Sequence, residues 1–288
     1  MNINMIIPPL KIQGKKTKIV PHIQELTKQI LKDNPNIDTW IEPFFGTGVV
    51  GFNVPDQIKT VIVSDINPYI IEFYENIKHG VITGSSIKEW LMLMGTKLAL
   101  SDENGYVFYR EMREEFNKTK DIKLFLFLSR TSFNGMMRFN KKGEWNLPYC
   151  KVPEKLNEKA ITSLCEEIDK LYDLMQKKKF IFLNQSFEET LKLANDNSII
   201  YCDPPYLGLY TNYFDTWDYE NEKQLNTTLE TIKCPKIVST WFDNGKTKNE
   251  IIDQLWSKWN INLINHKYNV GAKVSNRRQV IEALLYKK

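Results

Sequence analysis

The sequence of 288 residues is poor in the side chains that bind transition metals. Its four cysteines contain no Cys-x-x-Cys pair, and its three histidines show no spacing typical of a metal site. We therefore expect no bound metal and reduced thiols, as in a cytoplasmic protein. No run of about 18 apolar residues is present, so we expect neither a membrane span nor a membrane partner.

Charge of one sign is also scarce, because the formal net charge is only +4. Its distribution is uneven: residues 130–160 contain seven lysines and arginines against three glutamates, an excess equal to that of the whole chain. With 42% hydrophobic and 26% charged residues, the composition is that of a globular protein of one or two domains. The basic stretch is therefore more informative than the total charge.

Asp203-Pro204-Pro205-Tyr206 follows an apolar run at residues 199–202 that predicts a buried strand. Proline removes an amide donor and favours extended geometry in the residue before it, so the strand must stop at Asp203. Its edge then presents the Asp203 carboxylate, the Pro204 carbonyl and the Tyr206 ring. Two acceptors beside an aromatic ring suit a flat base that carries an exocyclic amino group. The alternative is a Pro-Pro turn with an incidental acid.

A second motif lies between two further predicted strands, at residues 39–44 and 60–65. Gly46-Thr47-Gly48 follows the first strand, and such glycines let the backbone turn tightly and approach a ligand, with a helix expected to start beyond. Asp65 ends the second strand, nineteen residues after Gly46. A carboxylate at this spacing meets ribose hydroxyls in nucleotide-type sites. Together the two features predict a nucleoside cofactor, whereas each alone is compatible with a turn and a helix cap.

The alternation of strands and helices lapses between about residues 80 and 175, which indicates an inserted region made mainly of helices and loops. The expected helices cover residues 20–31, 67–78, 87–100, 106–117, 122–130, 161–175, 187–194 and 249–259, and the later strands cover residues 179–184, 199–203, 236–241, 261–266 and 279–286. In an open α/β sheet the glycine turn, Asp65 and Asp203 lie at the carboxyl edge, where a cofactor and an amino-bearing base would face each other.

Within the inserted region, residues 129–149 combine arginine, asparagine and glycine with aromatic residues, as an exposed functional loop does. Aromatic rings beside arginine and asparagine can wedge between bases, stack on them and read their edges. The alternative is a hydrophobic hairpin that packs on the core and carries solvated lysines.

In this order the motifs resemble those of the Dam-type DNA adenine-N6 methyltransferases, over nearly the whole chain. Residues 11–16 are similar to the family's N-terminal Lys-Trp-x-Gly-Gly-Lys, and residues 42–48 to its cofactor loop. Asp65 matches the family's ribose acid, and Asp203-Pro204-Pro205-Tyr206 its catalytic motif. Residues 133–148 are similar to its DNA-reading hairpin.

The resemblance implies an α/β fold: a Rossmann-like, S-adenosylmethionine-dependent methyltransferase sheet with an inserted, mainly helical target-recognition domain. Residues 1–82 and 172–288 would form the catalytic domain, and residues 83–171 the target-recognition domain, which binds DNA.

The resemblance also implies roles for individual residues. The catalytic residues would be Asp203, Pro204, Pro205 and Tyr206. The cofactor-binding residues would be Lys11, Gln13, Gly14, Lys15, Phe44, Gly46, Thr47, Gly48, Asp65, Ile66, Ser186, Phe187 and Asp203. The DNA-binding residues would be Lys16, Arg130, Phe133, Asn134, Met136, Arg138, Asn140, Lys141, Lys142 and Pro148.

Two departures from the family pattern concern the cofactor. Ile12 replaces the family's tryptophan and Lys15 its second glycine, which alters the contacts to the methionine end of the cofactor. Ser186 stands where the family usually has an acid that binds the cofactor's adenine, so a hydroxyl or a backbone group would substitute there.

The implied reaction transfers a methyl group from S-adenosylmethionine to N6 of adenine. The amino group is a poor nucleophile because its lone pair is delocalised into the ring. Acceptance of its two N–H bonds by Asp203 and the Pro204 carbonyl favours a pyramidal nitrogen. The target lies inside the duplex, so the base must flip out, at a cost of a few kcal/mol. Cytosine C5 methylation would need a nucleophilic cysteine, usually after a proline, and no cysteine of this chain follows one.

The implied partners are duplex DNA and a companion restriction endonuclease that acts on the same site. Two other interpretations stay open on the sequence alone. One is a degenerate methyltransferase fold that binds DNA without catalysis, and the other is methylation of RNA or of cytosine N4.

Overall fold

The computed structural model describes the chain except for residues 1–4, 13, 15, 101, 208–216 and 269–277. Within the described residues, seven strands form one sheet in the order β3-β2-β1-β4-β5-β7-β6. The strands are β1 (Thr39–Glu42), β2 (Thr60–Ser64), β3 (Lys179–Leu183), β4 (Ser198–Cys202), β5 (Lys236–Asp243), β6 (Asn260–Tyr268) and β7 (Arg278–Lys287). Each overlaps a strand expected from the sequence, which confirms the predicted α/β class.

Strands β3, β2, β1, β4 and β5 run parallel, so their carboxyl ends share one edge of the sheet. The central strand β4 is buried along its whole length, as its unbroken apolar sequence predicts for a parallel strand covered on both faces. Strands β6 and β7 add an antiparallel pair beside β5. The shared edge is what brings the ends of β1, β2 and β4 together.

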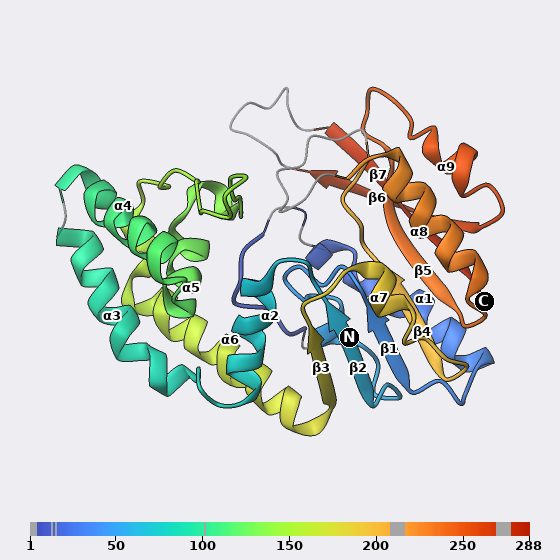
Figure 1. The fold of residues 1–288 in the computed structure, drawn as a ribbon, viewed down its shortest axis with the longest axis horizontal. Coiled ribbons are helices and arrows are strands. Elements are labelled where there is room, and N and C mark those ends of the chain that lie inside the picture. The colour runs from blue at the N-terminus through green and yellow to red at the C-terminus, as the bar shows by residue number, and fades with distance from the viewer. Residues whose placement is uncertain (1–4, 13, 15, 101, 208–216, 269–277) are drawn as a thin grey trace.

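Helices cover both faces of the sheet (Figure 1). Successive residues of β4 point to opposite faces, and they divide between two hydrophobic clusters, Ile199 and Tyr201 in one and Ile200 and Cys202 in the other. The helices of the first cluster include α1 (Val20–Asp33), α2 (Pro68–Lys78) and α6 (Glu158–Lys177). The second cluster is covered by α7 (Phe187–Leu191), α8 (Tyr219–Thr231) and α9 (Ile251–Leu255).

The predicted helical insertion lies between β2 and β3. Figure 1 shows α3 (Gly84–Leu100), α4 (Asp102–Thr119) and α5 (Ile122–Thr131) grouped at the side of the sheet far from β6 and β7. Asp121 begins α5 by accepting hydrogen bonds from the amides of Lys123 and Leu124, at 2.7 and 3.3 Å. Helix α6 then leads back to the sheet and runs across residue 171, where the sequence places a domain boundary.

Residues 132–149 form an irregular hairpin on the insertion. Two isolated bridges join its arms, between Ser132 and Tyr149 and between Phe139 and Trp145. Trp145 is buried, and its ring lies edge-on to Phe125, with centroids 5.9 Å apart. The inner side of this hairpin is therefore part of the core, while its turn at residues 141 and 142 is exposed.

Two predictions about helices are wrong. Beyond Gly48 only a 3₁₀ turn, η2 (Gly51–Asn53), follows, because Pro55 restricts Val54 to an extended conformation with ψ of 150°. Helix α9 spans only Ile251–Leu255 and not residues 249–259, because Trp256 and Trp259 turn into the core, with ring centroids 4.9 Å apart.

Helix α8 has no counterpart among the predicted elements. Its sequence is mostly polar, and it buries Leu225 and Leu229 with one acid, Glu222, so its apolar stripe is short. A capping box of Asp218 and Asn221 begins it. In the described part of the chain, every helix is too short or too polar to cross a membrane.

Candidate active site

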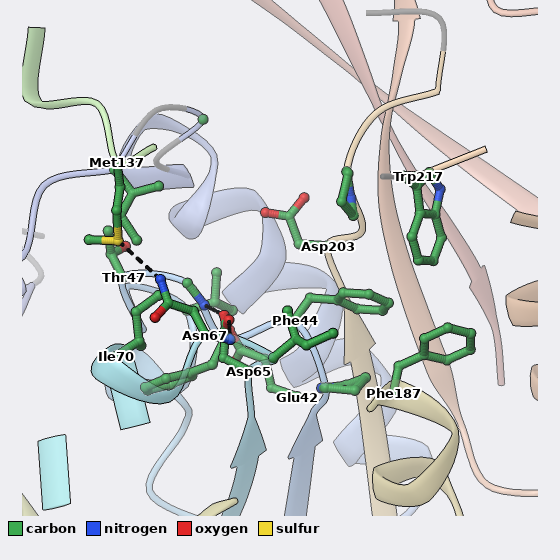
Figure 2. A pocket seen from close by; sticks show the side chains of 18 of the residues that line it. Glu42, Phe44, Thr47, Asp65, Asn67, Ile70, Met137, Phe187, Asp203 and Trp217 are labelled. Carbon is green, nitrogen blue, oxygen red and sulfur yellow. Dashed lines mark hydrogen bonds between the residues drawn. The ribbon is translucent and has the colours of Figure 1, made fainter. Parts of the chain in front are cut away.

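A cavity of about 280 Å³ opens at the carboxyl ends of β1, β2 and β4 (Figure 2). Of the residues predicted to bind a cofactor, nine line it: Gly14, Phe44, Gly46, Thr47, Asp65, Ile66, Ser186, Phe187 and Asp203. Gly48 is buried against the Phe45 and Phe52 rings, and the Lys11 side chain lies against Gly135 of the hairpin. Gln13 and Lys15 lie outside the described residues.

Backbone hydrogen bonds fix the glycine turn after β1. The Phe45 amide donates to the Ser64 carbonyl at 2.9 Å, and the Gly48 amide to the Phe45 carbonyl at 2.8 Å. Gly46 and Gly48 both have left-handed backbones, with φ of 53° and 77°. A Cβ on Gly46 would meet no atom within 4 Å, whereas a Cβ on Gly48 would lie 2.4 Å from the rings of Phe45 and Phe52. Gly46 therefore presents bare backbone to open space, and Gly48 is required by packing.

Asp65 joins the glycine turn to the start of α2. One carboxylate oxygen accepts the Gly46 amide at 2.8 Å, and the other accepts the Asn67 amide at 2.9 Å. Burial raises the pKa of the Asp65 carboxyl, and these two hydrogen bonds oppose that rise. Asp65, the predicted ribose acid, thus lines the cavity and also fixes the adjacent glycine turn.

Asp203 follows β4 and lies in the same cavity, with a side chain 19% exposed. Burial raises its pKa to about 6, and the nearby Lys16 ammonium, 3.1 Å from Oδ1, limits the rise. Glu282 of β7 acts in the opposite direction, because a second negative charge disfavours ionisation of Asp203. The Tyr206 hydroxyl lies 3.4 Å from a Glu282 carboxylate oxygen.

Lys16, which is predicted to contact DNA, is buried beside Asp203. Lys16 is only 6% exposed, its ammonium is paired with Asp203, and it lies 4.4 Å from the centre of the Tyr206 ring. The lysine is therefore an electrostatic partner of the Asp203-Pro204-Pro205-Tyr206 motif and does not lie on an outer surface.

Arg130, another predicted DNA contact, is also largely buried. Its side chain is 13% exposed, donates to the Pro9 carbonyl at 3.0 Å and lies 3.9 Å from the Glu167 carboxylate. Burial lowers its pKa, and Glu167 opposes that shift. Because α5 turns this arginine toward α6 and the N-terminal segment, it ties these elements together.

The other predicted DNA contacts lie on the hairpin. Phe133, Asn134, Lys141, Lys142 and Pro148 are exposed, and Met136, Arg138 and Asn140 are half-buried. The Arg138 guanidinium donates twice to Asn146, to Oδ1 at 2.7 Å and to the carbonyl at 3.1 Å. Asn140 donates to Glu144 at 2.7 Å. The hairpin thus holds its polar side chains in fixed positions.

An aromatic wall closes the cavity on the α7 side. The Phe44 ring stacks on Phe187 with centroids 5.5 Å apart, and Trp217 meets Phe44 edge-on at 5.4 Å. Trp217 is held by a hydrogen bond from its indole to Glu222 at 2.7 Å. Ser186 caps α7 by accepting the Glu189 amide at 3.4 Å, so its hydroxyl has a structural role beside the cavity.

Several lining residues are missing from the prediction: Ile12, Glu42, Asn67, Ile70, Met137, Phe139, Gln185, Glu188, Trp217 and Asn221. Glu42 could have been predicted, because it begins the glycine motif. Burial raises the pKa of its carboxyl well above the usual range, and the Trp40 indole donates a hydrogen bond to it at 2.9 Å. Met137 and Phe139 alternate along the chain with the predicted DNA contacts. Because alternate side chains of an extended segment point to opposite sides, this alternation could have indicated that the two residues face inward.

Comparison with known proteins shows similarity to DNA methyltransferases over most of the chain. A family model described as D12 class N6 adenine-specific DNA methyltransferase matches residues 13–270. The chain is 31% identical to the Type II methyltransferase M.MjaIII of Methanocaldococcus jannaschii, over 96% of this chain and 97% of that protein. It is 30% identical to a DNA adenine methylase of Vibrio cholerae, over 96% and 94%. It is 26% identical to the DNA adenine methylase of Escherichia coli K12, over 91% of each.

The two glycines of the turn predict different effects on stability. Gly46→Ala should cost about 1–2 kcal/mol of unfolding free energy, because alanine must adopt a left-handed backbone. Gly48→Ala should cost a further 1–3 kcal/mol, roughly, because its methyl group also meets two buried rings. Urea denaturation of the two variants measures the difference. Equal stabilities would show that Phe45 and Phe52 accommodate the methyl group.

Proposed function

Because the chain belongs to the D12 class of N6 adenine-specific DNA methyltransferases, we propose that its cavity holds S-adenosylmethionine and a flipped-out adenine side by side. The observation that carries this proposal is the position of Asp203. Its half-buried carboxylate lies at the end of β4, in one cavity with the glycine turn and with Asp65. A cofactor site and an acceptor for an amino group therefore adjoin each other.

The residues present suit the cofactor. Gly46 offers bare backbone to open space, Asp65 offers a buried carboxylate for hydroxyl groups, and Phe44 with Phe187 and Trp217 offers an aromatic wall for a purine. When bound, S-adenosylmethionine supplies an electrophilic methyl group on a sulfonium. The chain's own task is to position the acceptor, which needs no covalent enzyme intermediate.

Asp203 would accept one N–H of the adenine amino group, and the Pro204 carbonyl would accept the other. These acceptors orient the nitrogen lone pair and stabilise positive charge that develops there. The Tyr206 ring would stack on the base. Lys16 favours the ionised form of Asp203, which is the form that accepts hydrogen bonds, while burial and Glu282 oppose ionisation.

We assign target recognition to residues 83–171 and catalysis to the rest of the chain. The local excess of positive charge on the hairpin supports DNA binding there. Exposed Phe133 and Asn134 are suited to fill the gap that a flipped base leaves, and Arg138 is suited to read a guanine. Lys141 and Lys142, at the exposed turn, are suited to phosphate contacts.

We further propose a companion restriction endonuclease that cuts the same site, since the archaeal relative is named a Type II methyltransferase. The substrate is chromosomal or foreign DNA, which in bacteria and archaea lies in the cytoplasm, so the enzyme would act there. Mapping of modified bases tests the function. Purified protein is incubated with labelled S-adenosylmethionine and, in separate reactions, duplex DNA or RNA, and N6-methyladenine at one sequence of the DNA is expected. N4-methylcytosine, labelled RNA or no label would contradict the proposal.

Asp203→Ala should abolish methyl transfer and keep cofactor affinity, because the carboxylate acts on the substrate amino group. Asp65→Ala is the matched contrast: loss of a charge-assisted hydrogen bond should weaken cofactor binding by roughly 1.5–3 kcal/mol. Calorimetry with S-adenosylhomocysteine and a single-turnover transfer assay separate the two effects. Near-normal turnover of Asp203→Ala on duplex DNA would refute its catalytic assignment.

The pH dependence of transfer follows from Asp203. Its folded pKa of about 6 exceeds the unfolded value of 3.8, so the reactive carboxylate form is lost as the pH falls through 6. The single-turnover rate at pH 5 should be about one-tenth of its plateau.

Lys16→Met removes the cation that lowers the pKa of Asp203, so the fall of the rate at acid pH should begin at a higher pH. Lys18→Met, on the exposed side of the same segment, is the control, and an unshifted limb in Lys16→Met would contradict the pairing.

Arg138 and Lys141 should differ in what their loss changes. Arg138→Ala should relax specificity at one base pair by about 1–3 kcal/mol, because it removes a contact to a base edge. Lys141→Ala should weaken all sequences alike and reduce the salt slope by about one. Binding to the mapped site and to singly substituted sites, across a salt series, measures both. If Arg138→Ala weakens all sites equally, Arg138 contacts only the backbone.

A further inference from the structure

The aromatic wall of the cavity depends on an acid that lies behind it. Glu222 is part of α8 and is only 4% exposed. Its Oε2 accepts a hydrogen bond from the Trp217 indole at 2.7 Å, and its Oε1 accepts one from the Trp256 indole at 3.0 Å. Trp217 lines the cavity, whereas Trp256 is buried in the second hydrophobic cluster. One carboxylate thus joins a cavity residue to the core.

Both partners of this carboxylate can only donate. An indole N–H is a donor without acceptor capacity, so each of the two indoles here takes an oxygen atom of its own. Glutamine has the same shape but offers one oxygen and one amino group. Burial raises the pKa of the Glu222 carboxyl, and the two indole hydrogen bonds oppose that rise. A buried acid at this position is therefore explained by two rings that are held at the same time.

The contact between Trp217 and Glu222 lies at the start of α8. Asp218 is the N-cap, so Trp217 is the residue before the cap and Glu222 is the fourth residue of the helix. Two apolar side chains commonly pack on each other at these two positions. Here the contact is a hydrogen bond, which fixes the direction of the indole as well as its distance. The start of a helix does not need this restriction, so we looked for its purpose in the cavity.

The direction of the Trp217 ring determines the shape of the aromatic wall. The ring meets Phe44 at 86° and Phe187 at 61°, with centroids 5.4 and 5.7 Å apart, while the two phenylalanine rings are stacked at 26°. Figure 2 shows Trp217 beside Phe187 on one side of the site. The wall therefore has two surfaces at a steep angle, and rotation of the indole would remove one of them.

We propose that Glu222 is a positioning residue for the cofactor, because it holds the Trp217 indole at the angle at which the indole forms the second surface of the purine site. The inference rests on the function proposed above. Glu222 contacts neither the purine nor the reacting atoms, so its effect on cofactor affinity is transmitted by Trp217. The transfer step is unaffected, because Asp203 lies at the end of β4 and not on this helix.

The test is a double-mutant cycle on the dissociation constant of S-adenosylhomocysteine, measured by calorimetry on the full chain. Glu222→Leu removes both acceptors and restores the common apolar pairing at the start of α8. It should weaken binding by about three- to ten-fold, the range that one aromatic contact contributes. Trp217→Phe keeps a ring without the N–H, so in that background Glu222→Leu should change the dissociation constant by less than about two-fold.

Enzyme kinetics give a second readout. In Glu222→Leu the KM for S-adenosylmethionine should rise in step with the dissociation constant, while the single-turnover rate at saturating cofactor stays at its native value. A role of Glu222 in the stability of α8 alone would not separate KM from the rate in this way. A fall in the saturating rate would show that Glu222 acts on the transfer step, and it would overturn the inference.

Glu230→Leu is the matched control, because Glu230 lies on the same helix and accepts a hydrogen bond from the Trp259 indole at 2.6 Å, away from the cavity-lining residues. It should leave the dissociation constant at its native value. An equal weakening in Glu230→Leu, no weakening in Glu222→Leu, or the same weakening with and without Trp217 would contradict the assignment.

Thermal melts establish that each variant is folded. If Glu222→Leu does not fold, Glu222→Gln, which keeps one acceptor oxygen, takes its place in the cycle. Failure of the proposed function has a different signature, since the native enzyme would then deposit no N6-methyladenine.

Discussion

The hydrogen bond from the Gly46 amide to the Asp65 carboxylate joins the ends of two neighbouring strands, and the cavity depends on it. Parallel pairing of β1 with β2 places the two groups at one edge, and pairing of β1 with β4 adds Asp203 there. A buried acid is costly unless it is hydrogen-bonded. Asp65 meets this cost with two backbone amides, and in doing so it fixes a loop whose left-handed glycine leaves its own backbone accessible.

Much of the fold follows from local sequence patterns. The buried strands are short β-branched runs, and α1 and α2 carry clear apolar stripes, so elements with strong local signals were found. Helix α8 was not found, because a mostly polar helix with a buried acid has a weak periodic signal. A helix was expected beyond Gly46 and Gly48, yet Pro55 leaves room for one 3₁₀ turn only.

Site residues that belong to a short sequence motif were predictable. Site residues that are brought in by tertiary contacts were not. Asp203 and Pro205 of the motif line one cavity with Gly46, Thr47 and Asp65. The pairing of Lys16 with Asp203 joins residues far apart in sequence, so the sequence alone did not show that this predicted DNA contact is buried beside the motif. The burial of Arg130 was not predictable for the same reason, since its position on a helix does not reveal which side faces α6.

The place of the insertion, between the two adjacent strands β2 and β3, has a consequence for folding and for divergence. These strands pair in register although more than a hundred residues separate them, so the sheet is completed only after the inserted helical region has been spanned, which slows folding. The closure entropy rises only with the logarithm of length, at about 0.6 kcal/mol per doubling. Insertions of different size can therefore be exchanged at this point with little change in the stability of the sheet, so that one sheet can carry many different inserted regions.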